Sequence, residues 1–191
     1  MKCMPLPDKK YNTLVIDPPW DISLTGIWRK RENRKLKLDY VTMSLQEIKE
    51  IPIRNILEQG SHVYLWATNK TLSSAFDVLK EWGCSYHLTL VWCKPSFIAP
   101  CLAYQFATEF ILLGFYGKPM QKFSGEISLN WFKATQKRNG HSSKPEVFYQ
   151  IVKKMSPEPR LDLFSRRKIE GFDGWNNGVS SNEQRGVEGE K

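Results

Sequence analysis

Four consecutive residues, Asp17-Pro18-Pro19-Trp20, suit the binding of a planar ring that carries an amino group. The Asp17 carboxylate can accept one amino N–H, and the Pro18 carbonyl can accept another without an N–H of its own to compete. The prolines stiffen the turn, and Trp20 offers a face for base stacking, worth roughly 1–3 kcal/mol. Such a site could orient the weakly nucleophilic exocyclic nitrogen of adenine for direct displacement on a methyl donor.

The same four residues are equally compatible with a turn that merely ends a strand, with a structural aspartate and a core tryptophan, because short motifs match by chance. Their context is informative. Residues Thr13–Asp17 are β-branched and aliphatic up to the Pro-Pro pair, a pattern typical of a buried strand. In an open α/β sheet, ligands bind outside the carboxyl ends of the strands, and the tetrapeptide stands at such an end.

The rest of the chain alternates strand-like and helix-like segments. Capping boxes at Ser44–Glu47 and Ser143–Glu146 predict two helices, which should end near Ile51 and Met155. The other predicted elements are strands at His62–Thr68, Tyr86–Cys93, Glu109–Phe115 and Arg160–Phe164, and a helix at Thr71–Trp82 with Gly83 at its C′ position. This alternation predicts one α/β domain over residues 1–178, with a mostly parallel sheet and helices on both faces, followed by a disordered polar tail over 179–191.

The composition favours a polyanionic partner. The formal net charge is +8 and the aromatic content is 13%, so nucleic acid is the first partner to consider and an anionic membrane the second. The longest apolar run, Phe110–Phe115, is too short to cross a bilayer, and we expect no membrane partner. The cysteines and histidines show no zinc-ligand spacing, so we expect no metal and reduced thiols, as in a cytoplasmic protein, or a nuclear one in a eukaryote.

A series of landmarks along the chain decides between the two interpretations of the tetrapeptide. Taken together, they resemble the MT-A-70-like adenine methyltransferases, in the order that this family shows, from about Tyr11 to Asn177. The landmarks are Asp17–Trp20, Tyr40–Ser44, Leu65–Asn69, Trp82-Gly83, Val91–Lys94, Thr108–Gly114, His141–Pro145, Pro159–Phe164 and Trp175–Asn177.

The resemblance implies a Rossmann-like class I methyltransferase fold in permuted order, with the catalytic strand ahead of the cofactor-binding strand. It also implies S-adenosylmethionine as the cofactor and a role for each of several residues. Asp17, Pro18, Pro19 and Trp20 would hold the adenine, Tyr40 would help to close the pocket, and Asp17, Lys144, Phe164, Arg166 and Asn177 would contact the cofactor.

Some of these residues have plainer interpretations. Lys144 could be a first-turn helix lysine, and Arg166 could belong to a solvated basic run. Glu109 could simply begin a strand or could orient the base, whereas Trp66 and Trp92 are expected in the core. The chain also departs from better-known members of the family at Lys168-Ile169 and Gly178, where their polar ribose contacts are absent.

The substrate is expected to be DNA rather than RNA. The chain shows no zinc-finger cysteines and no added RNA-binding domain, so it resembles the short prokaryotic or phage members that methylate DNA, for which a duplex adenine would have to flip out of the stack. A basic segment after the catalytic turn is interpreted as a phosphate-binding loop rather than a solvated one. Its cations are Arg29, Lys30, Arg31, Arg34, Lys35 and Lys37.

Three alternatives stay open at this point. They are an RNA adenosine methyltransferase, a methyltransferase acting on cytosine, and a non-catalytic nucleic-acid-binding partner subunit. The intact tetrapeptide favours an enzyme over a partner subunit. The sequence leaves open a homodimer or a related partner chain.

Overall fold

The computed structural model describes residues 5–21, 42–101, 104–119, 127–135, 144–165 and 167–176. Its elements are β1 Tyr11–Ile16, α1 Leu45–Lys49, the 3-10 helix η2 Ile53–Ile56, β2 Leu57–Ala67, α2 Leu72–Glu81, β3 Cys84–Cys101, β4 Tyr104–Tyr116, β5 Trp131–Lys133, α3 Glu146–Met155, β6 Arg160–Leu163 and β7 Asp173–Trp175.

These strands form one sheet in the order β5-β3-β4-β2-β1-β6-β7. The pairs β2–β1, β1–β6, β6–β7 and β3–β5 are parallel, as predicted for most of the sheet. Strand β4 is the exception, because it pairs antiparallel with both β2 and β3. Only two residues separate β3 from β4, and a connection that short returns the chain in the opposite direction.

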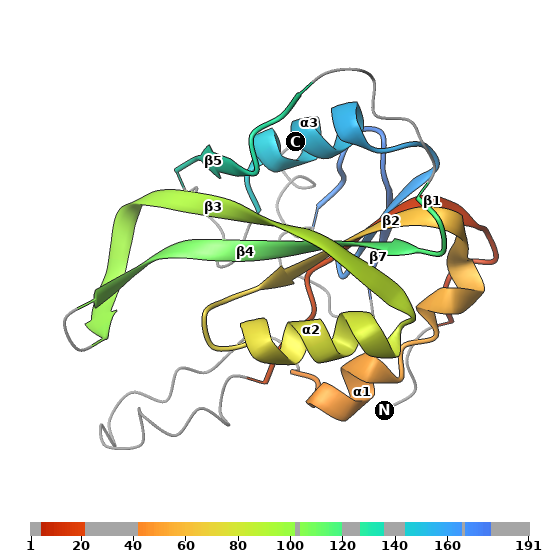
Figure 1. Ribbon diagram of the computed structural model, residues 1–191, viewed down its shortest axis with the longest axis horizontal. Helices are drawn as coiled ribbons and strands as arrows, with labels where there is room; N and C mark the ends of the chain where they lie inside the picture. Colours follow the sequence, from red (N-terminus) through yellow and green to blue (C-terminus); the bar gives the residue numbers. More distant parts are fainter. Residues whose placement is uncertain are drawn as a thin grey trace, which may run out of the picture.

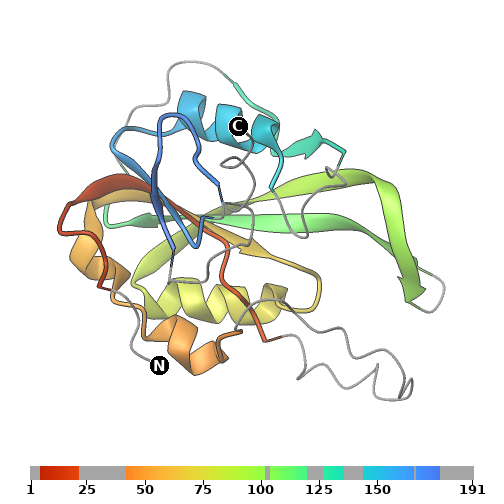
Figure 2. The same ribbon diagram turned by 180° about the vertical axis from the view of Figure 1, so that it is seen from behind.

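Helices cover both faces of the sheet (Figures 1 and 2), with α1 and α2 on one face and α3 on the other. Alternate residues of β1 pack into the cores on the two faces of the sheet, because successive side chains of a strand point to opposite faces. Leu14 and Ile16 join the core under α1 and α2, and Val15 joins the core under α3. The predicted architecture of an α/β sheet with helices on both faces is confirmed.

Most predicted elements are present, with shifted bounds. The Ser44 capping box forms, since the Ser44 hydroxyl accepts the Glu47 amide and the Glu47 side chain accepts the Ser44 amide. Gly83 has φ +74° after α2, as a C′ glycine requires. The three-residue strands β5 and β7 were not predicted, because so few residues carry no periodicity.

The capping box expected at Ser143–Glu146 is wrong. Helix α3 begins at Glu146 after an extended Pro145 with φ −72° and ψ 144°, so Glu146 is the first helical residue rather than the third. A proline at the boundary excludes helical backbone from the residue before it, which explains the later start. Lys144 therefore lies before the helix, in an extended segment, and its side chain is not that of a first-turn lysine.

Candidate active site

Three parallel strands end at the same edge of the sheet, and this edge carries the candidate site. The carboxyl ends of β1, β2 and β6 are level, because Ile16 pairs with both Leu65 and Leu163. The antiparallel β4 passes this edge at Phe110, which pairs with Ala67. Although β1 and β6 are far apart in the chain, they are neighbours in the sheet, so the residues that follow them come together in space.

The turn after β1, residues Asp17–Trp20, is closed by backbone hydrogen bonds. The Trp20 amide donates to the Pro18 carbonyl at 2.8 Å, which makes a γ-turn centred on Pro19. The Met43 amide donates to the Pro19 carbonyl at 2.8 Å, and the Asp21 amide donates to the Met43 carbonyl at 3.2 Å. Each prolyl carbonyl keeps a second lone pair, so the Pro18 oxygen retains acceptor capacity beyond its bond within the turn.

Trp20 is fixed from its polar end. Its indole Nε1 donates to the Trp66 carbonyl at 3.1 Å, near the end of β2, and its half-buried ring packs against the core under α1 and α2. The bridge between Trp20 and Met43 brings together the two ends of the segment 22–41. The segment 22–41 contains the basic run expected to bind phosphate. The described residues on either side of this segment therefore lie beside the Asp17–Trp20 turn.

Four charged side chains of alternating sign line the α3 face of this edge. The Lys144 Nζ lies 3.2 Å from Asp17 Oδ1 and 3.0 Å from Glu109 Oε2. The other Glu109 oxygen, Oε1, lies 2.5 Å from the Nζ of Lys94. We call the series Lys94, Glu109, Lys144 and Asp17 the ion chain. It links β3, β4, the segment before α3, and β1.

The ion chain rests on two tryptophan rings of the sheet. The Lys144 Nζ lies 4.4 Å from the centre of the Trp66 ring, and the Lys94 Nζ lies 4.6 Å from the centre of the Trp92 ring. Both rings are about 1% exposed and pack edge to face, which confirms that they belong to the core. Cation–π contacts of this kind are strongest where water is excluded, so the indoles partly offset the cost of burying both ammonium groups.

Glu109 and Lys144 stay ionised although burial opposes their charged forms. Burial alone would raise the pKa of Glu109, but the charges of Lys144 and Lys94 outweigh it and hold that pKa below its usual value. Burial alone would lower the pKa of Lys144, but Asp17 and Glu109 outweigh it and raise that pKa. The lowered pKa of Glu109 and the raised pKa of Lys144 are consistent, because each shift favours the charged form. A buried pair of this kind is stable only with both partners present.

A buried carboxyl group lies on β6, the strand next to β1. Asp162 of β6 pairs with Val15 in the sheet and accepts a hydrogen bond from the Tyr149 hydroxyl at 2.9 Å. Burial, helped by the negative charge of Asp17, raises the pKa of Asp162 to about 7. Burial, with the nearby Asp162 carboxylate, also raises the pKa of Tyr149.

The predicted cofactor residue Phe164 follows β6 directly. It has φ +65°, an unusual backbone conformation for a bulky residue, and its ring meets the Trp175 ring edge to face at 5.5 Å. Trp175 ends β7, and its own indole donates to the Pro5 carbonyl at 3.1 Å. Phe164 is thus held in an aromatic pair at the same sheet edge as Asp17.

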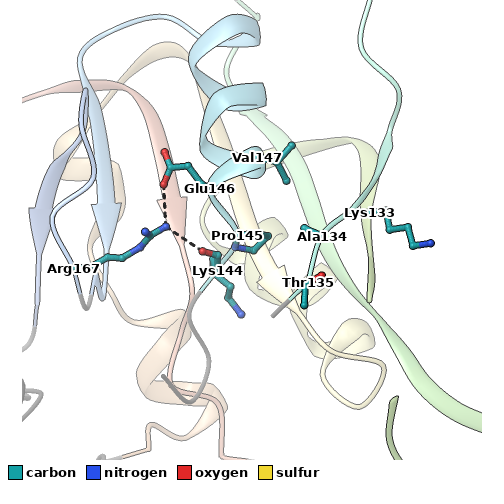
Figure 3. Close-up of a pocket in the computed structure, with 8 residues that line it drawn as sticks. All are labelled: Lys133, Ala134, Thr135, Lys144, Pro145, Glu146, Val147 and Arg167. Atoms are coloured by element: carbon teal, nitrogen blue, oxygen red, sulfur yellow. Dashed lines mark hydrogen bonds and ion pairs between the residues drawn. The ribbon is translucent and has the colours of Figure 1, made fainter. Parts of the chain in front are cut away.

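A surface pocket of about 180 Å³ adjoins Lys144 (Figure 3). The guanidinium of Arg167 donates to the Lys144 carbonyl at 3.1 Å and to the Glu146 carboxylate at 3.2 Å, which fixes the extended segment before α3. The pocket is lined by Lys133, Ala134, Thr135, Lys144, Pro145, Glu146, Val147 and Arg167.

Of the residues predicted for the site, the structure brings together Asp17–Trp20 and Lys144, with Phe164 one strand away. The others lie outside the described residues: Tyr40, Arg166, Asn177, and the basic residues Arg29, Lys30, Arg31, Arg34, Lys35 and Lys37. Lys94 received no role from the sequence, although a signal was present. It continues the inward alternation of Leu90 and Trp92, and a charged residue at an inward position implies a buried partner.

The part of the chain that the structure describes contains no cluster of three histidine, cysteine, aspartate or glutamate side chains able to hold a metal ion. Within the same residues, no helix has the length and apolarity needed to traverse a lipid bilayer.

A mixed α/β sheet with helices on both faces, and with charged and aromatic groups at the edge where its parallel strands end, is consistent with a Rossmann-like methyltransferase fold. The chain belongs to the MT-A70 family, whose sequence profile matches residues 11–178. It is also 27% identical over 187 residues to the Type II methyltransferase M.MunI of Mycoplasma sp, an alignment that covers 89% of this chain and 78% of that protein.

Proposed function

We propose that this protein transfers a methyl group from S-adenosylmethionine to the exocyclic N6 amino group of adenine in DNA. The observation that carries the proposal is the position of Asp17. Its carboxylate follows the central parallel strand β1, lies within a hydrogen-bonded turn, and is paired with Lys144 at 3.2 Å. Asp17 is paired and oriented before any substrate binds, as electrostatic catalysis requires.

The Asp17–Trp20 turn would hold the target base. The Asp17 carboxylate and the second lone pair of the Pro18 carbonyl would accept the two amino hydrogens, which draws electron density onto the nitrogen. The half-buried Trp20 ring would contact the base. Because the displacement needs no covalent intermediate with the protein, these residues would act by position and charge.

The residues at this edge fit the cofactor chemically. The cofactor supplies an activated methyl group on a positively charged sulfur, beside an ammonium and a carboxylate group. The Asp17 carboxylate suits its positive groups, Lys144 suits the carboxylate, and Phe164 with Trp175 offers an apolar contact for the adenosine. Lys144 already shares two carboxylates, so a cofactor carboxylate would be bound by further sharing of the same ammonium.

DNA as the substrate is supported by the similarity to a type II methyltransferase and by the net charge of +8. The basic segment Arg29–Lys37 is proposed to bind backbone phosphates. Both ends of the segment that contains it, at Asp21 and Met43, are joined to each other beside the catalytic turn. Contacts to phosphates would position the duplex without reading its sequence.

The proposal is tested by incubating the protein with labelled S-adenosylmethionine and matched DNA and RNA oligonucleotides, followed by mass spectrometry of the nucleosides. The expected product is N6-methyladenine in DNA. The Asp17→Ala variant should lose at least about a hundredfold in kcat, because a positioned electrostatic group is removed.

The matched control is Asp77→Ala, which removes an exposed carboxylate from α2 and should leave the rate unchanged. Methylation of RNA alone would reject the substrate, methylcytosine would reject the target atom, and full activity in Asp17→Ala would reject the mechanism. Calorimetry would reject an enzyme if DNA bound and S-adenosylmethionine did not.

A further inference from the structure

Lys94 is a buried cation that the proposed reaction does not yet use. Its side chain is 5% exposed, and its ammonium lies between the Glu109 carboxylate at 2.5 Å and the Trp92 ring at 4.6 Å. Burying an ammonium is costly, and replacing a whole buried ion pair by apolar side chains often costs little stability. The contacts of the ion chain explain why a lysine is buried at this position.

Glu109 divides its two oxygens between two lysines. Oε1 accepts from Lys94, and Oε2 accepts from Lys144. This fixes the plane of the carboxylate, because rotating it to favour one lysine would break the bond to the other. With Oε2 fixed, the Lys144 ammonium is held where it also reaches Asp17 Oδ1 at 3.2 Å.

The charges of the ion chain also balance. Within the four side chains of the ion chain, two lysines face two carboxylates, so their formal charges cancel. Without Lys94, Glu109 would lose one of its two lysine partners, and the remaining three side chains of the ion chain would carry a net negative charge. Either a proton would bind to the series, or Lys144 would move toward Glu109 and away from Asp17. Both responses would disturb the carboxylate proposed to hold the substrate.

We propose that Lys94 is a positioning residue: by holding Glu109, it makes Lys144 available to Asp17 and keeps the Asp17 carboxylate charged and oriented for methyl transfer. The effect on catalysis rests on the proposed function, whereas the coupling within the ion chain does not. Lys94 acts through Glu109 rather than directly on the turn that would bind the base.

The first test is a double-mutant cycle in the methylation assay. Lys94→Met should lower kcat about tenfold or more, while KM for S-adenosylmethionine changes less than about threefold, because the loss is one of orientation. Lys94→Arg should restore most of the rate. Lys94→Met should cause no further loss when combined with Glu109→Gln, because Lys94 acts through that carboxylate.

A matched control is Lys80→Met, which removes an exposed lysine from α2 and should not change the rate. If the methionine variant fails to fold, Lys94→Gln repeats the test with a polar neutral side chain. Wild-type kcat in a folded neutral variant would overturn the proposal, and so would independent, multiplicative losses from the Lys94 and Glu109 substitutions.

The second test follows protonation in the protein without substrate. Among the described residues, Lys94 from β3 and Lys144 from the segment before α3 face Glu109, and Asp17 after β1 faces Lys144. Removing Lys94 should raise the pKa of Glu109, and the acid limb of kcat/KM should move to higher pH by about one pH unit.

Carbon-13 NMR of labelled glutamate side chains measures the titration of Glu109 directly in wild type and Lys94→Met. An upward shift supports the coupling, and an unchanged titration overturns it, whether or not the protein methylates DNA. Absence of methyl transfer by the wild type would instead reject the proposed function, so the two failures are distinguishable.

Discussion

At the scale of single residues, Asp17 and Asp162 belong to neighbouring strands, since Asp17 follows β1 and Asp162 lies within β6, but their side chains have different surroundings. Asp17 has the Lys144 ammonium at 3.2 Å, and Asp162 has the neutral Tyr149 hydroxyl at 2.9 Å. A cation favours the ionised form of a carboxyl group, whereas burial favours the protonated form and a neutral donor such as Tyr149 offsets burial only in part. The pKa of Asp162 is accordingly raised to about 7, chiefly by burial.

The raised pKa of Asp162 predicts a loss of stability with increasing pH. The folded state binds the proton up to about pH 7, but in the unfolded chain the group ionises near its ordinary pKa of 3.8. The unfolding free energy from this group therefore falls between about pH 4 and 7, by about 4 kcal/mol. Asp162→Asn, which keeps an oxygen for Tyr149, should remove this fall.

Urea unfolding of both proteins at pH 4, 6 and 8 measures the effect. Other carboxyl groups contribute equally to both curves, so the difference between wild type and Asp162→Asn isolates the one group. The variant should gain stability relative to wild type as the pH rises. A difference that is constant across the three pH values would contradict the raised pKa.

At the scale of elements, close packing of β4 under α2 positions the strand that carries Glu109. Gly114 of β4 is the point of closest approach. A Cβ atom there would lie 2.9 Å from a Leu79 methyl carbon and 3.1 Å from the Ser85 carbonyl oxygen. The carbonyl belongs to the neighbouring strand β3, so it cannot rotate away as a side chain could. A single methyl group at this position would push apart α2, β3 and β4.

We predict that Gly114→Ala destabilises the protein by about 1–3 kcal/mol through overpacking. Gly174→Ala is the matched control, because a Cβ at Gly174 of β7 meets its nearest atom at 3.7 Å, an ordinary contact. Chemical denaturation should show a large loss for the first variant and a change within about 0.5 kcal/mol for the second. Equal effects would contradict this account of the packing.

At the scale of the whole molecule, the net charge of +8 favours association with a polyanion. The described fold places Asp21 and Met43, which are hydrogen bonded to each other, at the edge that carries the Asp17–Trp20 turn. The basic segment between them would then act close to the site of reaction. Binding of phosphates by such a segment releases counterions, so the affinity for DNA should fall steeply with salt.

We predict that replacing Arg34, Lys35 and Lys37 together by alanine weakens DNA binding evenly across sequences. The slope of log K against log salt should decrease by about one for each phosphate that the variant no longer binds. Fluorescence anisotropy at several salt concentrations measures this slope. Lys80→Ala serves as a charge control on α2, and an unchanged slope in the triple variant would show that the segment does not bind phosphate.

The sequence by itself determined the alternation of strands and helices, the position of the Asp17–Trp20 turn after a buried strand, and the family. These features are local, because periodicity, caps and short motifs depend only on residues that are close together in the sequence. It misplaced the start of α3, because the serine and glutamate spacing of a capping box is present at Ser143–Glu146 but Pro145 keeps the chain extended.

Only the tertiary structure decided which charges meet. Lys94, Glu109, Lys144 and Asp17 come from four separate segments, and nothing in their spacing shows that they form one series. Two features bring them together: the antiparallel β4, which carries Glu109 past the end of β2, and the segment before α3, which places the Lys144 ammonium against the Trp66 ring. Sheet order and register are set by packing across the whole core, so electrostatic partners distant in sequence follow from the fold and not from the motifs.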